Sequence, residues 1–292
     1  MRLIHLTDPH LSNLDGLGIS DLRGKRWSGF ISWSRNRREK YLPTVLEKLI
    51  AAVVAENADQ ILLTGDLVQI GLTQEIEQAR QWLGELGPPE QIMLVPGNHD
   101  IYARESMNTA YQSWAEYLFH DIDGPAQDFP VVRKLGGVSL IGLSTACVTP
   151  VFMASGRLGE RQLNRLAELL AQAKVEKQLV CLLIHHPPLP GMTKWRKALT
   201  DADALQAVLE PYPPELIFHG HLHHNREHLW GSTRIYCTAA ASSISDASYR
   251  VIDIEDRNDC QVFRAVLKSS TIETGDKLGF VTVDEQSWQI QK

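Results

Sequence analysis

The sequence predicts an α/β fold in which two packed β-sheets are flanked by helices. Over the first part of the chain, short apolar runs alternate with helical patterns, an order that favours parallel strands. From residue 233 onward, strand patterns follow one another without helices between them. We therefore expect a single domain over residues 1–292, with a basic aromatic insert at about 20–40 and a strand-rich part from about 233.

Each element of the alternating part has its own signal. Runs rich in Val, Ile and Leu predict strands at 2–7, 61–63, 91–95, 138–143, 179–184 and 216–218. Helices are predicted, chiefly by apolar residues three and four apart, at 41–57, 73–86, 104–120, 159–173 and 201–209. Thr73 is expected to cap the second helix, which has Glu75 and Glu77 in its first turn and ends at Gly87-Pro88-Pro89. The last strands are expected at 233–238, 250–254, 261–267 and 280–283.

The composition is that of an ordinary soluble globular protein. The chain is 43% hydrophobic and 22% charged, and its net charge of −6 argues against a strongly basic nucleic-acid binder. No run approaches the ~18 apolar residues of a membrane span, and the N-terminus lacks a signal-peptide pattern. The four cysteines are widely spaced, with no CxxC pair, which suits reduced thiols. These features predict a cytoplasmic protein and no nucleic-acid partner.

Five polar clusters each close a predicted strand. They are Asp8-Pro9-His10, Gly65-Asp66, Gly97-Asn98-His99-Asp100, His185-His186 and Gly220-His221-Leu222-His223. Each cluster taken alone is compatible with a plain polar turn. Because the carboxyl ends of parallel strands lie along one edge of a sheet, however, the clusters are expected to converge on one cleft.

The donor atoms in these clusters indicate a metal site. The candidate ligands are Asp8, His10, Asp66, Asn98, His185, His221 and His223. They offer oxygen and nitrogen but no thiolate, a set that suits manganese, iron, cobalt or zinc better than it suits a sulfur-bound structural zinc. Seven ligands are too many for one ion, so we expect two divalent ions as cofactors.

In order and spacing, the clusters resemble the motifs of the calcineurin-like metallophosphoesterase superfamily over residues 1 to about 225. The resemblance implies a four-layer α/β/β/α sandwich of two mixed β-sheets flanked by helices, carrying two metal ions. It implies that Asp8, His10 and His223 hold one ion, that Asn98, His185 and His221 hold the other, and that Asp66 bridges them.

The same resemblance implies a metal-dependent phosphoric ester hydrolase. Hydroxide held between the ions would attack phosphorus in line, and Asp66 is catalytic because it couples the two ions. His99 is expected to be a catalytic residue that is not a ligand and that protonates the leaving alkoxide or stabilises developing charge. Asp100, His5 and His186 are expected to support the ligands. His219, His224 and His228 are expected in loops or at the rim.

The substrate is predicted less directly. The sequence His185-His186-Pro187-Pro188 and the chain length are similar to the branch containing bacterial cyclic-nucleotide and glycerophosphodiester phosphodiesterases. This similarity favours a phosphodiesterase acting on a small organophosphate or a cyclic nucleotide. A different class of function, a catalytically silent metal-binding protein that recruits partners, conflicts with the complete ligand set. An oligomer is compatible with the strand-rich C-terminal part but is not required by it.

Residues 22–40 form a basic aromatic segment with three interpretations, of which the third is that it grips a nucleotide or single-stranded nucleic acid by stacking and phosphate contacts. The segment carries seven basic residues and one acid, interleaved with Trp27, Phe30, Ile31 and Trp33. Such a mixture can bind anionic lipid headgroups at the inner face of a membrane, which would suit a pyrophosphohydrolase of a lipid-linked nucleotide sugar such as UDP-diacylglucosamine. Alternatively, the segment is a cap whose tryptophans pack on the core, and Gly24 and Gly29 weaken a helix there.

Overall fold

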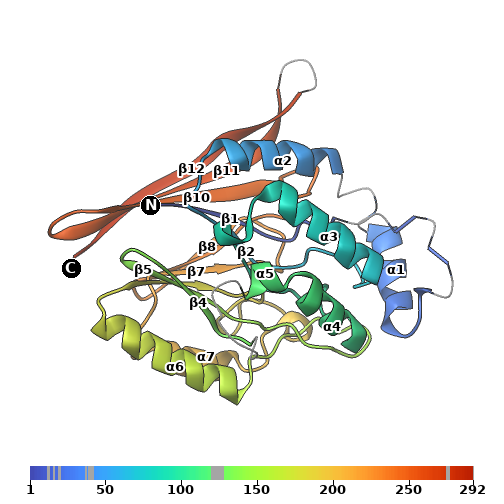
Figure 1. Cartoon of the computed structure of the whole chain (residues 1–292), viewed down its shortest axis with the longest axis horizontal. Helices are drawn as coiled ribbons and strands as arrows, with labels where there is room; N and C mark the ends of the chain where they lie inside the picture. The colour runs from blue at the N-terminus through green and yellow to red at the C-terminus, as the bar shows by residue number, and fades with distance from the viewer. Residues whose placement is uncertain are drawn as a thin grey trace.

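Two six-stranded sheets pack against each other in the computed structural model and carry helices on their outer sides (Figure 1). The structure describes residues 1–11, 14–15, 17–18, 21–36, 38, 43–119, 128–273 and 277–291. The predicted α/β architecture of two mixed sheets flanked by helices is confirmed.

The first sheet has the strand order β12-β11-β10-β1-β2-β3. Its parallel strands are β1 (Arg2–Leu6), β2 (Gln60–Leu63) and β3 (Ile92–Leu94). Its antiparallel strands are β10 (Ser248–Asp256), β11 (Cys260–Glu273) and β12 (Lys277–Gln291). The three parallel strands therefore end at the same edge, which is where the polar clusters begin.

The second sheet has the order β4-β5-β6-β7-β9-β8. Its four central strands run parallel and are β5 (Val138–Gly142), β6 (Leu179–Leu183), β7 (Leu216–His219) and β9 (Thr233–Cys237). The antiparallel edges are β4 (Val131–Leu135) and β8 (Arg226–Trp230). Here too, the carboxyl ends of the parallel strands share one edge.

Helices cover the outer sides of both sheets. They are α1 (Lys25–Asn36), α2 (Pro43–Ala55), α3 (Thr73–Leu86), α4 (Arg104–Ser113), α5 (Ala115–Leu118), α6 (Glu160–Val175) and α7 (Ala202–Leu209). Helices α2 and α3 lie over the first sheet, and α6 and α7 over the second (Figure 1). Helix α1 lies at the end of the molecule away from the C-terminus.

Strand β6 shows how the layers are built. Its side chains at 179, 181 and 183 join the core between the sheets, whereas Val180 and Leu182 join the core beneath α6 and α7. Successive side chains of a strand point to opposite faces, so a strand buried on both faces must be apolar throughout. This requirement explains why a continuous apolar run predicts β6.

The strands that depart from prediction are polar. Strands β11 and β12 are longer than predicted, and together they form a ribbon that extends beyond the rest of the sheet (Figure 1). Polar side chains along this ribbon weaken the apolar signal on which the prediction depends. Strand β8 is not predicted, because nearly all of its side chains are exposed at a sheet edge. Strand β4, also unpredicted, is a short edge strand whose apolar run is interrupted by Arg133 and Lys134. A strand held by backbone pairing at an edge leaves little apolar signal.

Two helical predictions need correction. Thr73 does not cap α3. It is the first helical residue, and the Glu75 carboxylate accepts hydrogen bonds from the backbone N–H groups of Leu72 and Gln69. The expected helix at 104–120 is divided at Trp114 into α4 and α5, and its last residue lies outside the described ranges. In addition, residues 25–36, for which no helix is predicted, form α1 despite the unfavourable Gly29.

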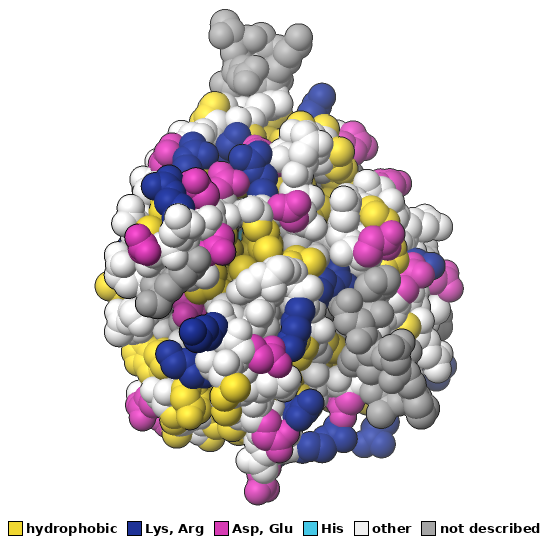
Figure 2. Space-filling model, turned by 60° about the vertical axis from the view of Figure 1, so that its left-hand side comes forward, with side chains coloured by type: hydrophobic (Ala, Val, Ile, Leu, Met, Phe, Trp, Pro, Cys, Tyr) yellow, Lys and Arg dark blue, Asp and Glu magenta, His cyan; other side chains and the backbone are white. Residues whose placement is uncertain are grey.

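Charge is mixed on the surface. On the face shown in Figure 2, the coloured basic and acidic side chains lie interspersed and do not form one continuous basic area. Neighbouring opposite charges form ion pairs, as where Arg264 pairs with Asp253 and Glu285 across strands of the first sheet. Within the part of the chain that the structure describes, no helix is both long enough and apolar enough to span a bilayer.

Candidate metal centre

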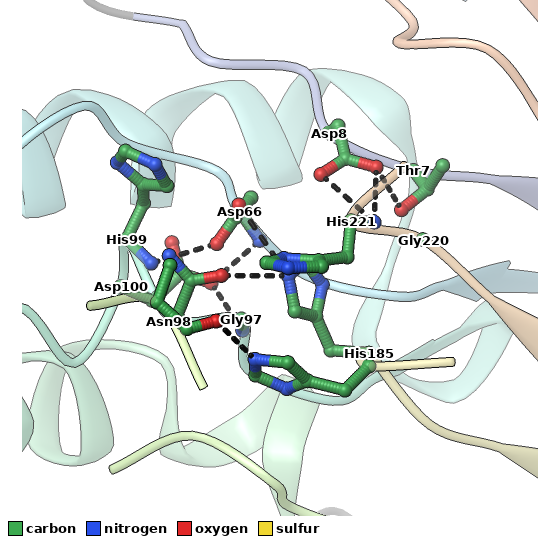
Figure 3. Close-up of polar contacts among 12 residues, drawn as sticks. Thr7, Asp8, Asp66, Gly97, Asn98, His99, Asp100, His185, Gly220 and His221 are labelled. Carbon is green, nitrogen blue, oxygen red and sulfur yellow. Dashed lines mark hydrogen bonds and ion pairs between the residues drawn. The ribbon is translucent and has the colours of Figure 1, made fainter. Parts of the chain in front are cut away.

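The predicted ligands meet where the two sheets face each other at the ends of their parallel strands. Asp8 follows β1, Asp66 follows β2, and Asn98 follows β3 of the first sheet. His185 and His221 follow β6 and β7 of the second sheet. Figure 3 shows these five side chains directed toward one another from separate strands. The expected convergence on one site is therefore present in the structure.

The ligand atoms form two groups. One group contains Asp8, His10, Asp66 and His223, and the other contains Asp66, His185 and His221, with the donor atoms of each group within 4.8 Å of one another. Asn98 adjoins the second group, with its Oδ1 3.2 Å from His185 Nε2. Asp66 is common to both groups, which is the position that a bridging carboxylate would need.

Backbone conformation sets these residues apart. Five of the seven candidate ligands have positive φ angles between 43° and 70°. These residues are Asp8, His10, Asp66, His221 and His223. Residues other than glycine rarely adopt this left-handed conformation, and where they do, the strain often marks a functional site. The left-handed residues make tight turns, and each turn brings two side chains of one loop into the site, as for Asp8 with His10 and for His221 with His223.

Close approaches between the loops require glycine. A Cβ atom on Gly220 would lie 2.0 Å from Thr7 Oγ1 and 2.8 Å from Asp8 Oδ2, and one on Gly97 would lie 2.2 Å from Asp66 Oδ1. No side chain fits at such separations. The glycines of the clusters thus allow the loops after different strands to pack against the ligand carboxylates.

Hydrogen bonds fix the ligand orientations. The Asp100 carboxylate accepts hydrogen bonds from backbone N–H groups of the loops after β2 and β3, at 2.8 to 3.2 Å. His10 Nδ1 donates to the Val68 carbonyl at 3.0 Å, and His185 Nδ1 donates to the Thr64 carbonyl at 2.6 Å. Both imidazoles therefore present Nε2 to Asp66, at 4.0 and 3.4 Å respectively.

The chemistry of the site fits a cation. His221 Nε2 is buried and has no hydrogen-bond partner among the described residues, although it lies in the second ligand group. Burial holds the pKa of His221 well below its usual range, which keeps the imidazole in the neutral form that binds metals. Burial alone would raise the pKa of Asp66, but His185 and His99 hold it well below its ordinary value, so this ligand is ionised.

His99 lies beside the ligands, as predicted for a residue that is not itself one. Its backbone N–H donates to Asp66 Oδ1 at 2.7 Å, and its Nδ1 donates to the carbonyl of Gln69. The half-buried ring lines the same pocket as Asp66 and Asn98. With Nδ1 committed to a carbonyl, Nε2 is the atom through which the ring would exchange a proton.

The remaining histidines divide into buried and exposed. His186 packs on the ring of His221, with centroids 4.5 Å apart, and donates through Nε2 to the Ala154 carbonyl, consistent with a supporting role. His5 is buried and bonds to Thr64 Oγ1 at 2.9 Å. The expectation of a loop or rim position is wrong for His219, which is buried in β7. His224 and His228 are exposed; His224 lies in the loop after β7, as expected, whereas His228 lies in the edge strand β8.

The site opens into a pocket of 410 Å³. Four candidate ligands and His99 line it, and its walls also include Lys25 of α1, Tyr102, Phe152 and Lys197. Phe152 and Lys197 have no direct signal in the sequence, because neither belongs to a strand-end cluster. Lys25 lies in the basic segment at 22–40, but the segment alone could not indicate which of its basic side chains faces inward.

Helix α1 packs on the body of the protein. Trp33 is buried at 3% exposure, and the Arg26 guanidinium donates to the carbonyls of Ile70 and Gly71. Trp27, in contrast, is 50% exposed. These contacts favour the cap interpretation of residues 22–40. Lys40 and two other residues of this segment lie outside the described ranges, and membrane binding stays an untested prediction.

Comparison with known proteins identifies the family. The family model described as calcineurin-like phosphoesterase matches residues 1–225. The chain belongs to this family. It is 27% identical over 185 residues to a probable cyclic nucleotide phosphodiesterase of Vesicomyosocius okutanii, covering 62% of this chain and 70% of the relative. It is 28% identical over 227 residues to the glycerophosphodiester phosphodiesterase GpdQ of Enterobacter lignolyticus, covering 76% and 71%.

The fold is shared with a dimetal phosphatase from Danio rerio. The TM-score is 0.60 at 16% identity, covering 97% of this chain and 98% of that one. Membership of the calcineurin-like phosphoesterase family makes the protein a metal-dependent phosphoester hydrolase. The family and the two ligand groups together indicate a site for two divalent metal ions.

Proposed function

We propose that this phosphoesterase is a phosphodiesterase that hydrolyses a small organophosphate diester or a cyclic nucleotide. One observation carries the proposal: two groups of ligand atoms share Asp66 at the wall of a single pocket. The relatives named as cyclic nucleotide and glycerophosphodiester phosphodiesterases support a diester as the substrate.

The proposed centre assigns each ligand to an ion. Asp8, His10 and His223 would hold one ion, Asn98, His185 and His221 the other, and Asp66 would bridge both. When bound, the two ions would neutralise phosphate charge and supply a water of lowered pKa for in-line attack at phosphorus. The oxygen and nitrogen donors suit manganese, iron, cobalt or zinc.

His99 is proposed to act on the leaving group. Hydrolysis of a diester expels an alkoxide, which needs a proton as the bond to phosphorus breaks. Since His99 Nδ1 donates to Gln69, the proton would come from Nε2 of the imidazolium form, which becomes the neutral Nδ1–H tautomer on transfer, and the backbone N–H of the same residue positions Asp66. One residue would thus both orient the bridging carboxylate and protonate the product.

We further propose that residues 1–292 form a single metallophosphoesterase domain in a reducing, cytoplasmic setting. The strand-rich part from about 233 contributes β9 to the second sheet and β10 to the first, so it completes both sheets. The insert at about 20–40 would cap the pocket through α1. All four cysteines are free thiols, which supports the proposed compartment.

A substrate panel tests the proposed function. The manganese-loaded protein is assayed with bis-(p-nitrophenyl) phosphate, cyclic AMP, p-nitrophenyl phosphate and UDP-diacylglucosamine. We expect the two diesters to be hydrolysed fastest, and we expect Asp66→Asn, purified identically, to be inactive because it uncouples both ions. Selective cleavage of UDP-diacylglucosamine would contradict the proposal and favour the membrane-surface alternative.

A further inference from the structure

The first residue of α1 carries a positive charge into the wall of the catalytic pocket. Lys25 Nζ donates to Thr149 Oγ1 at 2.5 Å and to the Met153 carbonyl at 3.1 Å, and it lies 4.6 Å from the centroid of the Tyr102 ring. Lys25 lines the same pocket as four of the candidate ligands, namely Asp66, Asn98, His221 and His223. The ammonium group therefore stands in the pocket that the two ligand groups share.

Among the residues that the structure describes, this charge has no carboxylate partner. An ammonium group has three donors, and the two acceptors of Lys25 are both neutral. Among the described residues, no carboxylate forms an ion pair with Lys25. Its neighbour Arg26 differs, because it pairs with Glu105 at 3.0 Å and donates to backbone carbonyls. The start of α1 therefore has a second basic anchor in Arg26, one that is paired with a carboxylate.

Burial makes the charged form of Lys25 unfavourable as long as the pocket holds no anion. Burial lowers the pKa of Lys25 to about 8, and Cys147 and Asp66 offset this only in part. A half-buried cation whose burial is offset only in part is stabilised when an anion enters the pocket. Phosphate is the anion that a phosphoesterase pocket must receive.

The position of Lys25 is fixed by packing. A Cβ atom on Gly29, one turn along α1, would lie 2.4 Å from the Tyr102 hydroxyl and 2.7 Å from Ile70 Cγ2. The same helix buries Trp33 in a small core with Ile70 and Tyr102. Because α1 approaches this closely, Lys25 is presented by a packed helix and not by a loose segment.

We propose that Lys25 is a substrate-binding residue that contacts the anionic oxygens of the phosphate group in the pocket. This inference rests on the proposed function, because it places a phosphate ester between α1 and the metal ligands. The insert at 20–40 then has a specific role, since α1 supplies a positive group on the wall of the pocket in addition to the ions.

The test compares Lys25→Gln with Lys25→Arg in the metal-loaded protein. Lys25→Gln removes the charge, whereas Lys25→Arg keeps it; Lys48→Gln makes the same charge change on the exposed side of α2 and serves as the control. Binding of inorganic phosphate is measured by titration calorimetry, with metal content, Tm, KM and kcat for bis-(p-nitrophenyl) phosphate recorded in parallel. Loss of a charge-assisted hydrogen bond should weaken phosphate binding by roughly 10- to 100-fold in Lys25→Gln. Lys25→Arg should recover most of the affinity.

Wild-type phosphate affinity in Lys25→Gln would overturn the inference, as would equal losses in Lys25→Gln and Lys25→Arg at normal metal content. If Lys25→Gln fails to fold, Lys25→Met replaces it, because methionine also removes the charge while keeping a long unbranched side chain. A wild-type protein that hydrolyses no diester would instead refute the proposed function, while a charge-dependent phosphate affinity would still support the role of Lys25.

Discussion

At the scale of the residue, the ligand positions combine buried charge with unfavourable backbone geometry. Asp8, Asp66 and His221 are buried and left-handed at the same time. A left-handed residue other than glycine costs about 1–3 kcal/mol, and an unpaired buried ligand adds a desolvation penalty. The fold tolerates these costs because the glycines and the Asp100 carboxylate fix the loops around the ligands. No sequence pattern reveals such φ angles, although the pattern does predict which side chains converge.

His99→Ala separates a catalytic role from metal binding. If His99 protonates the leaving group, kcat should fall on the order of 10²–10⁴-fold, while the metal content stays near that of the wild type. Elemental analysis and steady-state kinetics check both quantities. His228→Ala, which changes an exposed histidine of β8, should leave both unchanged. Loss of an ion from His99→Ala would show that the role assigned to His99 is wrong.

The pKa of Lys25 predicts a pH dependence. With a pKa of about 8 in the free enzyme, Lys25 is protonated below pH 8 and loses its charge as the pH rises through that value. Because kcat/KM reports ionisations of the free enzyme, the ratio of wild-type to Lys25→Arg kcat/KM should fall above pH 8. The arginine stays charged there. Parallel pH profiles for the two proteins would contradict this expectation.

At the scale of the element, the loops after different strands are interlocked. The Gly220 backbone at the end of β7 lies against Thr7 and Asp8 at the end of β1, so the two sheets touch at the site. Gly220→Ala should push the Asp8 carboxylate from its place, lowering metal content and reducing kcat/KM on the order of 10²-fold. Gly137→Ala, in the open turn between β4 and β5, is the matched control. Equal effects of the two substitutions would exclude a specific contact at Gly220.

Sequence patterns predict the buried elements better than the exposed ones. Apolar runs locate β1, β2, β6 and β7 within one or two residues, because these strands are buried on both faces. Helix α1 escapes prediction for a different reason. Gly29 weakens a helix in isolation, but here the missing side chain lets α1 contact Tyr102 and Ile70, and this packing outweighs the low propensity.

At the scale of the whole molecule, the metal centre joins the two sheets. Strands β1, β2 and β3 of the first sheet and β6 and β7 of the second each end in candidate ligands. The convergence of the seven candidate ligands can be predicted from the sequence, because the carboxyl ends of parallel strands lie along one edge of a sheet. Lys25 and Phe152 are not predictable, since they reach the pocket from segments whose position depends on tertiary packing.

Metal removal should therefore destabilise the whole fold. At a free metal concentration 100 times Kd, each bound ion stabilises the native state by about 2.7 kcal/mol. At about 2.1 cal/mol/K of unfolding entropy per residue, 1 kcal/mol shifts the Tm of a 292-residue chain by about 1.5–2 °C, so two ions should raise Tm by about 8–11 °C. Calorimetry with and without a chelator measures the shift, and chelator already saturated with metal is the control. Hydrogen exchange should then increase at the carboxyl ends of β2 and β6 alike, because the ions would link strands of both sheets. An unchanged Tm, or faster exchange confined to one sheet, would show that the ligands do not form a centre shared by the two sheets.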